Sequence, residues 1–329
     1  YDPATNSFSP TGNMTTPRIL FGAARLADGR VMVAGGTATL TPDVTAAITA
    51  TLRSAEIWNP ANGQWSATAN LGGNRLAPAL TRLPNGQIMV SGGVQVTLTT
   101  LPFPPFPTIP TAAVSTNAVQ RWNPANGAWT NGPNMAQGRA GHQYNQVTLA
   151  DGRVLMTGGV DGPSLLGAAT AAPIAGAEVF APAVGPSGTW TTVNMPTARA
   201  LHTATRLADG RVVVCGGAQG TLTTPVAIAD VDVFDPVGNS WSSALPLTGP
   251  RSGHVAEALP DGTLILFGGQ GATTTLTSIE TRRFCPPRRR GPLRRSAAQR
   301  PRAGQPAATG LRSTPRPSMS FITRSVITT

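Results

Sequence analysis

The chain has 329 residues and a mass of 33.7 kDa, and 40% of its residues are hydrophobic. Its 25 basic residues are all arginine and stand against 14 acidic ones, a formal net charge of +11. This length suffices for one large domain with a substantial core. Because no stretch of about 18 consecutive apolar residues occurs, we expect no membrane span. Two cysteines, Cys215 and Cys285, give no disulfide framework and leave the redox compartment open.

One phrase recurs five times along the chain. An Asp-Gly or Asn-Gly pair precedes a short apolar run, which ends at two successive glycines. The second glycines are Gly36, Gly93, Gly159, Gly217 and Gly269. Their spacings of 57, 66, 58 and 52 residues indicate stacked supersecondary units that share one core.

Each unit predicts four antiparallel strands. Asp-Gly or Asn-Gly supplies the positive φ of a tight turn between the first two strands. In the first unit the second strand covers residues 31–33, and a run apolar at every position indicates a strand buried on both faces. The paired glycines end it and allow a bulge or a close backbone approach. A third strand over 54–60 ends at a proline, and a fourth begins at Trp65.

The order and spacing of the sequence elements in each unit resemble those of the kelch repeat. The elements are Arg-x-x-His, a hairpin that ends in Gly-Gly, an acidic residue before an aromatic-x-Pro segment, and then Trp. The resemblance covers residues 1 to about 284. It implies an all-β propeller whose four-stranded blades surround a central channel. The sequence-based expectation agrees, because four-stranded sheets buried on both faces need radial stacking.

The two ends of the repeat region decide the number of blades. Residues 1–9 align with 234–242, the end of a third strand and a fourth strand, while residues 278–280 start a third strand that no Trp strand follows. We expect the N-terminal piece to complete the last blade and give five blades, which removes an open edge. Because such propellers more often have six or seven blades and the chain starts without Met or a signal peptide, a fragment of a longer ring is the alternative.

Length variation falls between the second and third strands, and these loops share one face of the predicted propeller with the connections between blades. We expect this face to bind a ligand, because function concentrates on loops held by a rigid scaffold. The longest loop, roughly Val94 to Ser115, contains a proline-rich segment with Phe103 and Phe106. Its proline spacing favours polyproline II, with the two phenylalanines as a contact patch. A stiff insertion lying on the neighbouring blade is the alternative.

An arginine stands 9 or 10 residues after the aromatic of each preceding fourth strand. These residues are Arg18, Arg75, Arg139, Arg199 and Arg251. The resemblance implies a role in gripping acidic peptides, which suits the paired donors of a guanidinium. A structural role is the alternative, because a third-strand position is acidic in four of five repeats. That position holds Glu56, Gln120, Glu178, Asp232 and Glu280.

The three histidines, His142, His202 and His254, each follow that arginine by three residues. They are candidates for ligand contact; a metal site is the less favoured interpretation, since a residue held in repeat register usually packs or hydrogen-bonds. The repeated tryptophans are expected to pack between blades. These are Trp65, Trp129, Trp190 and Trp241.

Residues 285–329 hold ten arginines, seven prolines and no acid, so we expect a disordered tail. Nucleic-acid binding is one interpretation of it, and a solvated extension is the favoured one.

We predict a non-catalytic interaction module without cofactor, whose partner is a protein or an acidic peptide and whose location is extracellular or on a bacterial cell surface. A carbohydrate-binding or degenerate galactose-oxidase-like propeller is the alternative. The copper chemistry of such oxidases needs tyrosines and a cysteine, but the only tyrosines are Tyr1 and Tyr144, and neither cysteine is placed for the link.

Overall fold

The computed structural model describes residues 2, 4–39, 50–100, 108–142, 145–162, 171–182, 187–221 and 224–284. All of them belong to the first of two units into which the chain divides, Tyr1–Pro286. The tail predicted for 285–329, with Cys285, and the two loop phenylalanines, Phe103 and Phe106, lie outside the described residues. Within the described residues the regular structure consists of strands, and no helix is long and apolar enough to cross a membrane.

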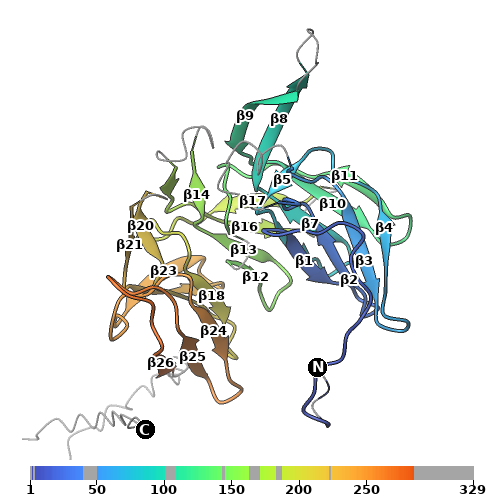
Figure 1. Cartoon of the computed structure of the whole chain (residues 1–329). Coiled ribbons are helices and arrows are strands. Elements are labelled where there is room, and N and C mark those ends of the chain that lie inside the picture. Colours follow the sequence, from blue (N-terminus) through green and yellow to red (C-terminus); the bar gives the residue numbers. More distant parts are fainter. Residues whose placement is uncertain are drawn as a thin grey trace, which may run out of the picture. The chain divides into compact units, whose positions relative to one another are not determined.

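Five antiparallel sheets follow one another along the chain, one for each repeat, and we call them blades 1 to 5 (Figure 1). Blade 1 consists of β1 (Gly22–Arg25), β2 (Val31–Ala34), β3 (Ala55–Asn59) and β4 (Gln64–Thr68). Blade 2 consists of β6 (Ala79–Arg82), β7 (Ile88–Ser91), β10 (Val119–Asn123) and β11 (Ala128–Asn131). Blade 3 consists of β12 (Gln146–Thr148), β13 (Val154–Thr157), β16 (Ala177–Ala181) and β17 (Thr189–Thr192). Blade 4 consists of β18 (Thr203–Arg206), β19 (Val212–Cys215), β22 (Val231–Asp235) and β23 (Ser240–Ala244).

Each blade is a meander in which every strand pairs with the next one of its own repeat, as predicted. The first strands of successive blades lie side by side, in the order β1, β6, β12, β18 and β24. The second strands are buried on both faces: every residue of β7, β13 and β19 is buried. These strands therefore carry the core, as their unbroken apolar runs predicted.

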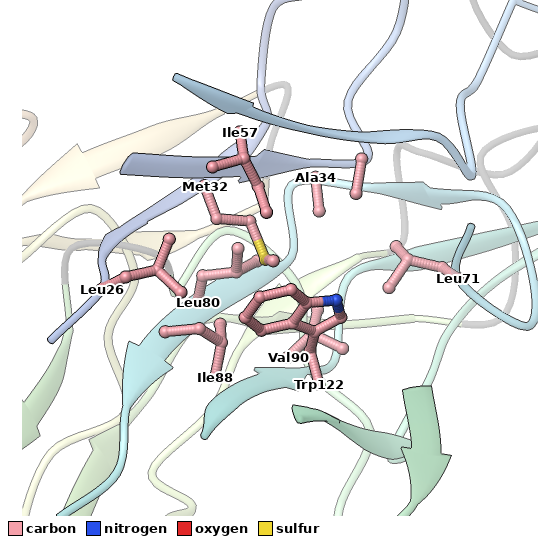
Figure 2. Close-up of a cluster of buried hydrophobic side chains, with 10 residues drawn as sticks. Leu26, Met32, Ala34, Ile57, Leu71, Leu80, Ile88, Val90 and Trp122 are labelled. Carbon is pink, nitrogen blue, oxygen red and sulfur yellow. The ribbon is translucent and has the colours of Figure 1, made fainter. Parts of the chain in front are cut away.

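The core lies between neighbouring blades. Figure 2 shows the cluster between blades 1 and 2, where Met32 and Ile57 of blade 1 meet Leu80, Val90 and Trp122 of blade 2. Similar clusters join blades 2 and 3, 3 and 4, and 4 and 5. Burying a side chain of this size contributes about 2 kcal/mol. The interfaces between blades, more than any single sheet, therefore stabilise the fold.

Blade 5 has three strands among the described residues: β24 (Val255–Ala258), β25 (Thr263–Phe267) and β26 (Ile279–Arg283). The prediction that residues 1–9 complete this sheet is wrong for the described part of that segment. Asp2 and Ser7 pair with each other instead, and Phe8 is 85% exposed. A six-residue turn satisfies its own backbone groups locally, without closing a loop across most of the chain.

The variable loops contain small sheets of their own. In blade 2, β8 (Val94–Thr100) and β9 (Thr108–Ser115) form a hairpin, which β5 (Arg75–Leu76) joins, and Figure 1 shows it projecting beyond the sheets next to it. The corresponding loops of blades 3 and 4 hold β14 (Val160–Asp161) with β15 (Ala172–Pro173) and β20 (Ala218–Gly220) with β21 (Pro225–Ala227). Much of the longest loop is thus paired strand, which its proline content did not indicate.

Candidate functional site

Every repeat arginine is buried at the point where its blade begins. In blade 3, Nη1 of Arg139 donates to the carbonyl oxygens of Gly158 and Gly176, at 3.0 and 2.6 Å. Its Nη2 donates to Oε1 of Glu178 at 2.6 Å, and both side chains are almost wholly inaccessible to solvent. The guanidinium therefore ties the ends of the second and third strands together within one blade.

The same arrangement recurs in three more blades. Arg18 pairs with Glu56 at 2.5 Å, Arg199 with Asp232 at 2.5 Å, and Arg251 with Glu280 at 3.5 Å. Burial raises the pKa of Glu56, but hydrogen bonds from Thr15 and Arg18 outweigh it and hold that pKa below the usual value of 4.5.

Blade 2 departs from this pattern because its third strand carries Gln120 in place of an acid. Arg75 donates to the carbonyl oxygens of Gly92 and Ala118 but makes no ion pair among the described residues. Burial without a carboxylate lowers the pKa of Arg75 to about 10. Blade 2 thus contains a buried cation that a neighbouring charge does not compensate.

These contacts give the arginines a structural role. An incoming carboxylate would have to displace the carbonyl acceptors that each guanidinium already has, and in four blades a carboxylate as well, inside a buried site. Contact of the five arginines with an external ligand stays a prediction, and this arrangement does not favour it.

The paired glycines form the joint between blades. The amide of Gly93 donates to the carbonyl oxygen of Arg139 in the next blade at 2.8 Å, and Gly36, Gly159 and Gly217 do the same to the next arginine. Gly92 has φ of +56°, and a Cβ there would overlap that carbonyl oxygen and lie 2.6 Å from Cε1 of His142. Of the two possibilities that the sequence left open at these glycines, a bulge or a close backbone approach, the structure shows the close approach.

The three histidines each hydrogen-bond to the preceding blade. Nε2 of His142 lies 3.2 Å from Oγ of Ser91, Nε2 of His202 lies 2.8 Å from Oγ1 of Thr157, and Nε2 of His254 lies 3.0 Å from Oγ1 of Thr203. Burial, followed by the charge of the neighbouring arginine, lowers the pKa of all three, that of His254 to about 4.

These histidines are therefore neutral at pH 7 and join one blade to the next. Among the described residues, no group of three His, Cys, Asp or Glu side chains is placed to hold a metal ion. Their contact with a ligand stays a prediction, although two of them also line the cavity described below.

Three of the four repeated tryptophans, Trp129, Trp190 and Trp241, also join blades, as predicted, whereas Trp65 contacts the segment that precedes blade 1. Each indole is half-buried, and its Nε1 donates to a carbonyl oxygen of the preceding connection: Trp65 to Gly12, Trp129 to Ala69, Trp190 to Pro133 and Trp241 to Val193.

A cavity of about 490 Å³ opens where the first strands of all five blades begin. We call it the loop-side cavity, because residues that precede these strands pair there with the start of the variable loops, Ala200 with Ala218 for example. Its lining includes the residue two positions after each repeat arginine. These residues are Leu20, Ala77, Gly141, Leu201 and Gly253. All five have a positive φ, between 50° and 67°, so the backbone turns in the same way at every blade.

The loop-side cavity is lined mostly by apolar atoms, and its rim exposes large hydrophobic side chains. Leu20 is 46% exposed, Leu201 45% and Val255 64%. Sequence reasoning did not find these residues. Leucine, alanine and glycine share no chemistry, so the fixed step of two residues after the arginine is the only signal that marked them.

No family model matches the chain. Among curated proteins, tRNA wybutosine-synthesizing protein 4 of Candida albicans is 32% identical over 94 residues, which are 29% of this chain and only 13% of that protein. The solved structure of YjhT matches with a TM-score of 0.56 and 13% sequence identity over 80% of each chain. At that identity the likeness concerns the fold alone. The register of the five repeats, their antiparallel blades and this likeness show the fold of a β-propeller, and its repeats resemble the kelch repeat.

Proposed function

We propose that this propeller is a non-catalytic interaction module that binds a protein or peptide at the loop-side cavity. The observation that carries the proposal is the cavity itself, a concave and mainly apolar site to which every blade contributes. Its volume lies in the range of small-ligand pockets, so it can enclose an apolar side chain of a partner and its neighbours. Apolar anchors buried in such pockets dominate the affinity of protein interfaces.

The surroundings of the cavity support a partner larger than a small molecule. Leu20, Leu201 and Val255 leave apolar surface at the rim, which a partner would remove from water. The hairpin of β8 and β9 belongs to the same side of the propeller, because β8 pairs with β5 just before the cavity residue Ala77. A peptide held in the cavity could therefore extend along this hairpin.

A carbohydrate partner, the alternative, finds less support in the lining. Sugars bind to sites rich in hydrogen-bonding groups, whereas most of the surface here is apolar. The described lining residues with polar side chains are Asn145, His202, Thr203, Thr205 and His254. Nε2 of each of the two histidines already lies within hydrogen-bond distance of a hydroxyl oxygen in the preceding blade. We therefore place the peptide ahead of the glycan.

Panning a phage-displayed random peptide library on the full-length chain tests the proposal. Enriched peptides are then titrated against wild type, Leu201→Asp and the control Val237→Asp. Val237 is 94% exposed in a turn of blade 4 that lies away from the cavity, so both variants add one acid to an exposed apolar site.

We expect Leu201→Asp to weaken peptide binding at least about tenfold, because binding would bury the new carboxylate against an apolar side chain of the peptide and remove it from water. Val237→Asp should bind like wild type. Peptides that bind wild type and Leu201→Asp equally well would overturn the proposal. The proposal would also be overturned if the library yielded no enriched peptide while the protein was retained selectively on a glycan array.

A further inference from the structure

The opposite end of the first strands carries a second pocket, of about 440 Å³. Its lining comes from the end of the first strand in blades 1 to 4: Arg25, Arg82 with Leu83 and Pro84, Thr148, and Arg206. We call it the turn-side pocket, because the Asp-Gly and Asn-Gly turns follow these residues directly. The three arginines are exposed and converge on one space.

Strand geometry explains why these arginines face the pocket. Each stands just before a leucine that is buried in the core, Arg25 before Leu26 and Arg206 before Leu207. Because successive side chains of a strand point to opposite faces, the residue before the buried leucine faces away from the core.

The charges of the turns leave these arginines without counter-ions. In blades 1, 3 and 4 the turn aspartate pairs with the arginine that follows it: Asp28 with Arg30, Asp151 with Arg153, and Asp209 with Arg211. The arginines that precede the turns have no ion pair among the described residues. Nη1 of Arg82 donates to the carbonyl oxygen of Leu26, and Nη1 of Arg206 to that of Thr148. The other guanidinium nitrogens of these arginines make no hydrogen bond to a described residue and remain as donors. Glu257 of blade 5 is not among the residues that line the pocket.

We propose that the turn-side pocket is a binding site for an anionic oxygen group, a carboxylate or a phosphate. Three guanidinium groups around one small space offer paired donors to such oxygens, and these charge-assisted hydrogen bonds are stronger than neutral ones. The hydroxyl of Thr148 adds a donor of another kind. The site is separate from the loop-side cavity, so the propeller presents an apolar site at one end of its first strands and a basic site at the other.

Titration calorimetry on the full-length chain tests this, with inorganic phosphate in one arm and succinate in the other, both at a constant ionic strength set with sodium chloride. We expect saturable binding in at least one arm, and the stronger arm identifies a phosphoryl or a carboxylate ligand. Arg25→Gln should weaken it by about tenfold, the loss of one charge-assisted pair of hydrogen bonds. Its melting temperature should change little, because Arg25 makes no ion pair among the described residues.

Arg53→Gln is the matched control, since it removes one exposed arginine that does not line the pocket. It should bind as wild type does. Arg206→Gln should reproduce the loss seen with Arg25→Gln. The proposal would be overturned if neither anion bound, or if Arg25→Gln and Arg53→Gln bound as tightly as each other, since the anion would then interact with the basic chain as a whole.

Discussion

The buried cation of blade 2 offers a substitution that should stabilise the protein. Glu178 of blade 3 shows where a carboxylate lies in this position: it accepts hydrogen bonds from the amide of Ala136 at 2.7 Å and from Arg139 at 2.6 Å. Gln120 accepts the equivalent amide hydrogen bond from Gly72 at 3.1 Å. Nε2 of Gln120 also donates to Oδ1 of Asn131 at 3.1 Å, so the Asn131 amide must turn its nitrogen toward a new carboxylate oxygen. With that turn, replacing Gln120 by Glu should place a carboxylate beside Arg75 without moving the backbone.

The pKa of Arg75 sets the size of the effect. Burial lowers it from 12.5 to about 10, and each unit corresponds to about 1.4 kcal/mol, so the unpaired charge costs about 3 kcal/mol. The new carboxylate must itself be desolvated, and its pairing recovers only a part of that amount. We expect Gln120→Glu to raise the free energy of unfolding by about 1 to 2 kcal/mol, which for a domain of this size is a rise in melting temperature of roughly 2 to 6 °C.

Differential scanning calorimetry at pH 7 measures this, with Glu178→Gln as the reverse exchange in blade 3. Glu178→Gln should lower the melting temperature, because Arg139 loses its carboxylate. A carboxylate paired in the folded state has a depressed pKa, as Glu56 does, so the gain of Gln120→Glu is present at pH 7 and is lost as pH falls below about 4.5. A melting temperature of Gln120→Glu at or below that of wild type at pH 7 would refute the reasoning.

Two further predictions concern the joints between blades. Gly92→Ala should lower the free energy of unfolding by about 3 kcal/mol or more, because the new Cβ meets the carbonyl oxygen of Arg139 at a positive φ. Gly141→Ala, at φ of +67° with open space around it, should lower it by about 1 kcal/mol. Chemical denaturation measures both variants, and equal losses of stability would contradict the close approach at Gly92. Stability should fall by about 2 kcal/mol between pH 7 and pH 5 on account of His254, since the imidazole binds a proton in the unfolded chain below about 6.5 but in the folded one only near 4. Denaturation curves of wild type and His254→Gln at the two pH values measure this, and an equal pH dependence in both would count against a neutral, buried His254.

The elements that depend on local chemistry could be predicted from the sequence. Asp28-Gly29 has the turn residue with positive φ, the run around Val213 is buried on both faces, and the glycines at 92 and 93 meet the next blade. These features follow from backbone sterics and hydrophobicity within a few residues, and five copies in register reduce the ambiguity of each.

What depends on the meeting of distant segments could not be predicted in the same way. The pairing of β8 with β9 joins segments rich in threonine and separated by prolines, a composition that indicates extended chain without naming its partner. The sequence alone singles out neither cavity. Leu201 and Gly253 share only a place in the turn, and Arg25 and Arg30 look equivalent until Asp28 is found to pair with Arg30. The expected closure of blade 5 by residues 1–9 rests on alignment and on the removal of an open sheet edge, and neither carries information about the competing local pairing of Asp2 with Ser7.

We assign Arg199 to the scaffold and Leu201, two residues later, to the proposed ligand site. Comparing Arg199→Gln with Leu201→Asp in melting temperature and in affinity for a peptide selected on the wild type tests that division directly. Arg199→Gln leaves Asp232 buried without its cation, so it should lose about 3 to 5 kcal/mol of stability yet keep its affinity when measured well below its melting temperature. Leu201→Asp should keep its melting temperature and lose the affinity. The opposite outcome, a stable Arg199→Gln that no longer binds and a Leu201→Asp that still does, would contradict the account.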